Sequence, residues 1–142
     1  MYLILSTLPH FYSILPIIPY YRTHTFGYIH CILLSTSFSI LYHVYEESNT
    51  IITALDYFFA FLMFLYDIYM GYRYTRIYLY TILGLNTVVF LTNLYIPEGN
   101  SYILYHSIWH LMSASKSVIV SYIIETQLRL IIPIRHVIES GA

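Results

Sequence analysis

Two histidines, His106 and His110, lie four residues apart in the stretch HSIWH of a strongly apolar segment. Residues four apart share one face of an α-helix, so both imidazole rings can present a nitrogen atom to the same ion. A third histidine, His43, ends the stretch SILYH and follows Ser39 by one helical turn. Three histidines around a divalent ion leave one tetrahedral position for water, which is typical of catalytic zinc sites.

A carboxylate and a hydroxyl complete this candidate site. Asp56 lies one to two turns inside the apolar segment that follows His43. An ionised aspartate at the centre of a bilayer costs about 2.5–3.5 kcal/mol, so it is normally paired and functional. Asp56 can orient a metal-activated water or take its proton, while Ser39 can donate a hydrogen bond to an oxyanion. We therefore predict Ser39 and Asp56 as catalytic residues, and His43, His106 and His110 as ligands of Zn²⁺.

The same residues also have a simpler interpretation. The chain has seven histidines, and both the His-x3-His and the Ser-x3-His spacing arise easily by chance. Ser6 and His10, for example, show the Ser-x3-His spacing across Pro9, without a partner in the sequence. Serine and histidine also form ordinary hydrogen bonds between membrane helices. Trp109 is either a lipid-facing anchor or the wall of a pocket. The meeting of both pairs and an aspartate at one depth favours the metal site.

The composition indicates an integral membrane protein. Of 142 residues, 58% are hydrophobic and only 9% are charged, whereas about a quarter of the residues of a soluble domain are charged. The mean hydropathy is +0.65. No cluster of lysine or arginine suggests a surface for nucleic acid. The single cysteine, Cys31, excludes a disulfide within the chain.

We predict an all-α fold with one transmembrane domain over residues 1–142, built as a bundle of about five helices. A membrane-spanning helix needs about 20 mostly apolar residues. The sequence contains five such segments, at residues 2–20, 26–46, 51–72, 76–96 and 102–125, followed by a cytoplasmic tail at 126–142. Pro9, Pro16 and Pro19 interrupt the first segment, which is therefore expected to be kinked or re-entrant.

Basic residues predict the orientation, because they accumulate on the cytoplasmic side of a membrane. One side of this topology carries Arg22, Arg73, Arg76, Arg129 and Arg135. The other side carries Glu46, Glu47 and Glu98. We therefore predict a multi-pass protein with a lumenal N-terminus and a cytoplasmic C-terminus. We expect its membrane to be an endomembrane such as the endoplasmic reticulum or Golgi. This topology places all the candidate site residues in the same leaflet.

Other charged residues in or near the apolar segments have structural interpretations. Asp67 lies close to Arg73 in the sequence, and we expect it to pair with this arginine or to reach the interface. Lys116 lies in the middle of the last predicted helix, where we expect a buried partner such as a backbone carbonyl. Glu125 and Arg129 are four residues apart and predict an ion pair at the membrane boundary.

The stretches SILYH, LDYFFAF and HSIWH together resemble the signature of the CREST superfamily of membrane hydrolases, which has Ser-x3-His on one helix, Asp on the next and His-x3-His on the last. The resemblance is strongest to the Per1-like GPI-remodelling proteins and the alkaline ceramidases, with the TMEM8/myomaker group as a further candidate. It implies zinc held by His43, His106 and His110 within seven transmembrane helices, with Ser39 and Asp56 completing the site. This chain is a shortened form, with one predicted helix between Asp56 and His106 where the family has three.

The resemblance implies a zinc-dependent intramembrane hydrolase that cleaves an ester or amide bond of a membrane lipid, in GPI-anchor remodelling or as a ceramidase. One alternative is a non-catalytic multi-pass protein whose metal or polar cluster holds its helices together, with a second copy or a helical partner. Another is a receptor-like member of the same superfamily. The expected partners are the lipid bilayer and a lipid substrate, and no nucleic acid.

Overall fold

The computed structural model describes residues 2–20, 25–45, 49–74, 77–97 and 99–139, and in these ranges the chain is all-helical, without a strand. Its α-helices are α1 (Tyr2–Thr7), α2 (Phe26–Val44), α3 (Thr50–Tyr74), α4 (Ile77–Asn93) and α5 (Asn100–Glu139). Several residues used to predict the orientation lie outside the described ones, namely Arg22, Arg76, Glu46, Glu47 and Glu98, together with the side chain of Arg135. The predicted all-α fold is confirmed, and the orientation stays a prediction.

Prolines break the first predicted span into short pieces. After α1, the chain continues as two 3-10 segments, η1 (Leu8–Ile14) and η2 (Ile18–Tyr20). Pro9 lies in the first turn of η1, where its missing N–H prevents a regular α-helical hydrogen bond. η1 packs against α5 and buries His10. The broken geometry therefore directs a titratable side chain of this segment into the protein.

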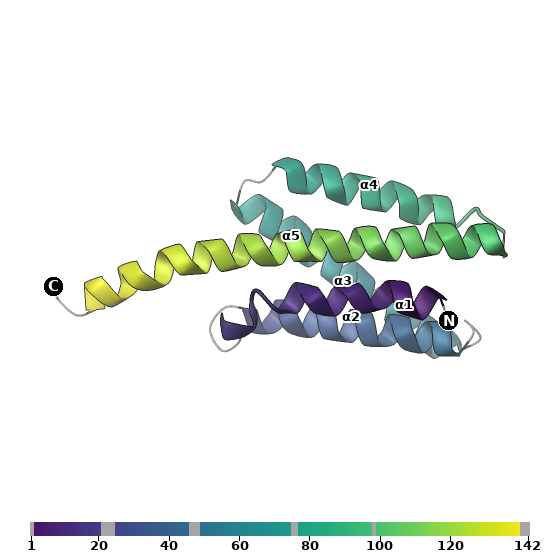
Figure 1. Cartoon of the computed structure of the whole chain (residues 1–142), viewed down its shortest axis with the longest axis horizontal. Helices are drawn as coiled ribbons and strands as arrows, with labels where there is room; N and C mark the ends of the chain where they lie inside the picture. The colour runs from purple at the N-terminus through teal and green to yellow at the C-terminus, as the bar shows by residue number, and fades with distance from the viewer. Residues whose placement is uncertain (1, 21–24, 46–48, 75–76, 98, 140–142) are drawn as a thin grey trace.

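The longest helix, α5, lies between the other helices. Figure 1 shows α4 on one side of α5 and the α1 and α2 pair on the other, with α3 passing behind. α5 contains 40 residues, which corresponds to about 60 Å, or twice the thickness of the hydrocarbon core of a bilayer. It continues through Pro133 to Glu139, beyond the predicted end at residue 125, and its C-terminal part extends past the other helices (Figure 1).

Polar side chains are concentrated inside the protein, and large apolar side chains cover its outside. The buried polar residues include Thr36, Ser39, Asp56, Asp67, Asn86, His106, His110, Lys116 and Ser117. The most exposed apolar residues include Tyr12, Leu15, Ile51, Phe61, Tyr72 and Ile77. An outer surface with this much apolar area is suited to an apolar environment or to another apolar surface.

Two of the described helical stretches are long and apolar enough to cross a membrane, Phe26–Val44 and Thr50–Tyr69. Only 33% and 17% of their residues are buried within the protein. Leu3–Ile14 and Leu79–Asn93 are apolar but shorter. The described residues thus contain fewer clear spanning helices than the five predicted, because prolines shorten the first segment and α5 carries the polar residues of the candidate site.

The turn into α5 depends on Gly99, whose backbone φ of +135° is in the region that favours glycine. We expect Gly99→Ala to lower the free energy of unfolding by about 1–2 kcal/mol through backbone strain alone, since a Cβ there meets no atom within 4 Å. Gly84 in α4 has similar open space, and Gly84→Ala should instead be stabilising by up to about 1 kcal/mol. Unfolding in detergent micelles measures both changes, and a shift of the same sign would contradict this explanation.

Candidate metal centre

Three histidines from two helices meet in the structure. His43 lies in the last turn of α2, and His106 and His110 lie in the first turns of α5. These helix ends are at the same end of the molecule (Figure 1). One ligand nitrogen from each histidine lies within 4.8 Å of the others. As predicted, this group can hold a metal ion.

The distances between the rings fit a tetrahedral ion. The ring centroids are 5.0 Å apart for His43 and His106, 5.2 Å for His43 and His110, and 4.7 Å for His106 and His110. Zinc–nitrogen bonds of about 2.1 Å would hold the ring centres of tetrahedral ligands roughly 5 Å apart. The Nε2 atoms of His43 and His110 are 3.0 Å apart, and such an ion would separate them by roughly 3.4 Å. These two nitrogens are therefore slightly closer than in a tetrahedral site, whereas the whole group, within 4.8 Å, would have to draw together on ligation.

His106 gives an independent reason to expect a bound cation. The residue is buried, and neither of its ring nitrogens has a hydrogen-bond partner within the described part of the chain. A buried polar group without a partner costs about 1–3 kcal/mol. A metal ion between the three rings would bind one of these nitrogens and remove that cost. The donor set, three imidazoles, is one that zinc commonly uses.

A cavity of about 390 Å³ adjoins the three histidines on the side of His110. His110 lines this cavity, whereas His43 and His106 do not. The apolar part of the wall consists of Met63, Phe61, Phe64, Phe90, Leu91 and Trp109. Trp109 is therefore part of a pocket wall, one of its two predicted positions.

Ser39 and Asp56 line the same cavity and are both buried. Ser39 Oγ has no hydrogen-bond partner among the described residues. Its hydroxyl is therefore able to donate to a group that enters the cavity. The structure places both predicted catalytic residues beside a cavity that reaches His110, and their roles stay a prediction.

A fourth histidine, His10, lines this cavity as well. Its Nδ1–H donates to the carbonyl oxygen of Thr7 at 3.0 Å, and its ring is edge-on to that of His110 with centroids 6.4 Å apart. The sequence provided no partner for His10, because Pro9 prevents its position from being read on a regular helix. The one feature of the sequence that could have indicated a role for His10 is the presence of a titratable residue within an apolar, proline-rich segment.

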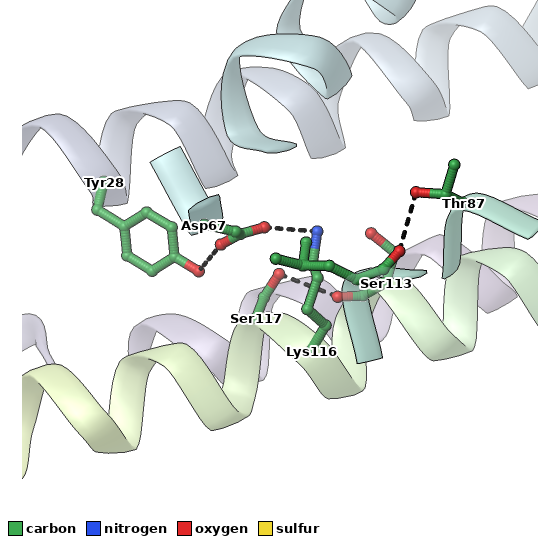
Figure 2. A network of polar contacts seen from close by, with 7 residues as sticks. Tyr28, Asp67, Thr87, Ser113, Lys116 and Ser117 are labelled. Carbon is green, nitrogen blue, oxygen red and sulfur yellow. Dashed lines mark hydrogen bonds and ion pairs between the residues drawn. The ribbon is translucent and has the colours of Figure 1, made fainter. Parts of the chain in front are cut away.

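A second polar cluster lies farther along α5, where the structure corrects two predictions. Asp67 Oδ2 lies 2.6 Å from Lys116 Nζ, and the Tyr28 hydroxyl donates to Asp67 Oδ1 at 3.0 Å. Figure 2 shows these side chains pointing toward one another between the helices. The predicted pairing of Asp67 with Arg73 is therefore wrong, and the buried partner expected for Lys116 is a carboxylate instead of a backbone carbonyl. Six residues separate Asp67 from Arg73, so the two lie on different sides of α3.

The two arginines, Arg73 and Arg129, lie on the surface. Arg73 donates to the Tyr69 hydroxyl at 3.0 Å on the exposed side of α3. Arg129 Nη2 and Glu125 Oε1 are 2.8 Å apart, which confirms the predicted ion pair. Because Arg129 is largely exposed, this pair contributes little to stability.

Comparison of the chain with protein-family models, curated proteins and solved structures found no match. The resemblance of the three motifs to the CREST superfamily therefore stays a prediction from the sequence. The candidate site rests on the residues and distances described above.

Proposed function

We propose that this chain is a multi-pass membrane protein that binds zinc through His43, His106 and His110 and hydrolyses an ester or amide bond of a lipid. The observation that carries the proposal is the convergence of the three imidazole rings beside a cavity with both polar and apolar walls. The three motifs that resemble the CREST superfamily support the same function. By that resemblance, the reaction belongs to GPI-lipid remodelling or to ceramide cleavage.

The distribution of polar and apolar residues supports the membrane part of the proposal. Charged and polar residues are buried, whereas large apolar side chains are exposed along α2 and α3. In water this arrangement would be unfavourable, but a bilayer stabilises it. The endomembrane location and the lumenal N-terminus belong to the proposal too, and the orientation rests on the distribution of arginines in the sequence.

Three histidine ligands leave one coordination position available in a tetrahedral zinc site. A zinc ion bound there would supply a water molecule that is nucleophilic at neutral pH. The cavity meets the cluster at His110, so a lipid carbonyl in the cavity can approach from that side. This access favours a catalytic site over a closed structural one.

The other residues of the cavity have the chemistry that hydrolysis requires. Water adds to the carbonyl carbon, the bond to the leaving oxygen or nitrogen breaks, and the proton released by the water must reach the leaving group. Asp56, a carboxylate in the wall of the cavity, would accept and return this proton. The Ser39 hydroxyl can donate a hydrogen bond to the oxyanion. The apolar wall would hold part of an acyl chain.

A non-catalytic role is the second candidate, favoured by the position of the cluster. His43 joins α2 to the two α5 histidines at one end of the bundle, so a metal ion there would also hold the helices together. On this view, substitutions of the histidines lower stability, and the protein with metal bound releases no lipid product.

Lipid turnover by purified protein in vesicles separates the two candidates. We expect Asp56→Asn to retain bound zinc but to lower the rate of release of fatty acid from ester- and amide-linked lipids by about 100-fold or more, as for loss of a general base. His30→Ala is the control, because His30 lies near the opposite end of α2 and bonds the carbonyl of Phe26. Equal rates for wild type and Asp56→Asn, or no product from zinc-loaded wild type, would contradict the catalytic proposal.

A further inference from the structure

We propose that His10 is a positioning residue of the metal centre, holding through its Nε2 the molecule that occupies the coordination position left by the three histidine ligands. The inference rests on the metal site of the proposed function and adds a residue from a different part of the chain. His10 belongs to η1, which packs against α5, and it lines the cavity.

The first step concerns the orientation of the His10 ring. The carbonyl oxygen of Thr7 accepts a hydrogen bond from Nδ1, so Nδ1 carries the proton of the neutral ring and Nε2 is an acceptor. Ser13 Oγ donates to the carbonyl oxygen of His10 at 2.6 Å and stabilises the turn that carries it. Both bonds are buried. The ring is therefore held in one orientation. Because His10 lines the cavity and Nδ1 is bonded to Thr7, we assign Nε2 to the side of the cavity.

The second step excludes His10 as a direct ligand in the observed geometry. Its ring centroid is 6.4 Å from that of His110, whereas the three proposed ligands are separated by 4.7–5.2 Å. For zinc–nitrogen bonds of about 2.1 Å, a 6.4 Å separation would require the two nitrogens on nearly opposite sides of the ion, roughly 180° apart. His10 therefore lies outside the first coordination shell, where it can contact a ligand of the ion but not the ion itself.

The third step concerns the direction of the remaining coordination position. His110 is the proposed ligand that lines the cavity, and His10 lines it beside His110. A molecule bound to the ion from the cavity therefore enters between the two rings, where an acceptor nitrogen can bind its hydrogen. Polar groups just outside a metal site commonly orient its ligands in this way, and their loss typically costs 10–100-fold in affinity or activity.

Two substitutions separate this role from a purely structural one. His10→Asn keeps an amide nitrogen near the position of Nδ1, so it can retain the bond to Thr7 while the Nε2 group is lost. His10→Gln places its amide near the position of Nε2 and gives up the bond to Thr7. Each variant therefore preserves one of the two functions of the ring.

The test uses Co²⁺ as the probe, because its visible absorption reports the number and kind of ligands. We expect His10→Asn to change the visible bands of the Co²⁺ protein and to weaken Co²⁺ binding about 10–100-fold, while His10→Gln restores the bands of wild type. If His10→Asn melts at the same temperature as wild type, the Co²⁺ bands of this variant test the role of Nε2. If His10→Asn is less stable than wild type, the Co²⁺ bands of His10→Gln are used in its place. Wild-type bands for a stable His10→Asn protein, or altered bands for His10→Gln, would overturn the inference. Failure of wild type to bind Co²⁺ would overturn the proposed metal site itself.

Discussion

Lys116→Met is expected to lower the free energy of unfolding by about 3–5 kcal/mol, because it leaves a buried carboxylate without its counter-ion. Asp67 is completely buried and Lys116 is 3% exposed, with the charged atoms 2.6 Å apart. Tyr28 donates to the other carboxylate oxygen but supplies no charge. Asp67→Leu should cost a similar amount, since it leaves the ammonium group of Lys116 buried.

The double variant Asp67→Leu/Lys116→Met is expected to be closer in stability to wild type than either single variant. Replacing both charges by apolar groups of similar volume removes their desolvation cost together with their attraction, and is often neutral. Unfolding by denaturant in detergent micelles measures all three variants. Glu125→Gln, which breaks the surface pair with Arg129, is the control and should cost less than about 1 kcal/mol. Additive effects of the two single substitutions would contradict a direct buried pair.

His106→Ala is expected to weaken zinc binding by more than about 100-fold, because loss of a direct ligand exceeds the 10–100-fold effect of outer-shell partners. The same substitution removes a buried imidazole that has no hydrogen-bond partner among the described residues. It should therefore destabilise the metal-free protein less than an ordinary cavity-forming substitution, for which about 2–5 kcal/mol is typical.

Competition for zinc with a chromophoric chelator measures this affinity. His30→Ala provides the matched control, since it removes an imidazole from the same protein at a site distant from the cluster. We expect His30→Ala to bind zinc like wild type. Equal affinities for His106→Ala and wild type would show that zinc binds elsewhere.

The three-histidine group could be predicted in part because the pairing of His106 with His110 depends on local helical geometry. His106 and His110 are one turn apart whatever else α5 contacts, and antiparallel helices bring the end of α2 to the start of α5. The length of the apolar segments and the scarcity of charge were likewise sufficient to predict an all-helical chain. The His106–His110 pair and the helices need only short-range information from the sequence, and the approach of His43 follows from the order and direction of the helices.

The partner of Asp67 could not be predicted in the same way, because the rotation of one helix against another depends on packing across the whole bundle. Lys116 is 49 residues from Asp67 in the chain, and only the contact of α3 with α5 makes them neighbours. His10 was missed because a proline-broken segment has no regular period. The length of α5 was underestimated, since Pro133 and the charges before it are typical of a helix end.

Zinc K-edge X-ray absorption of the purified protein tests the three-histidine site. We predict about one zinc ion per chain, with nitrogen or oxygen ligands at about 2.0–2.1 Å and the outer-shell scattering of three imidazole rings. His106→Ala should lose this signal, whereas His30→Ala should keep it. A wild-type protein without zinc, or a zinc spectrum that lacks the imidazole scattering, would contradict the three-histidine site.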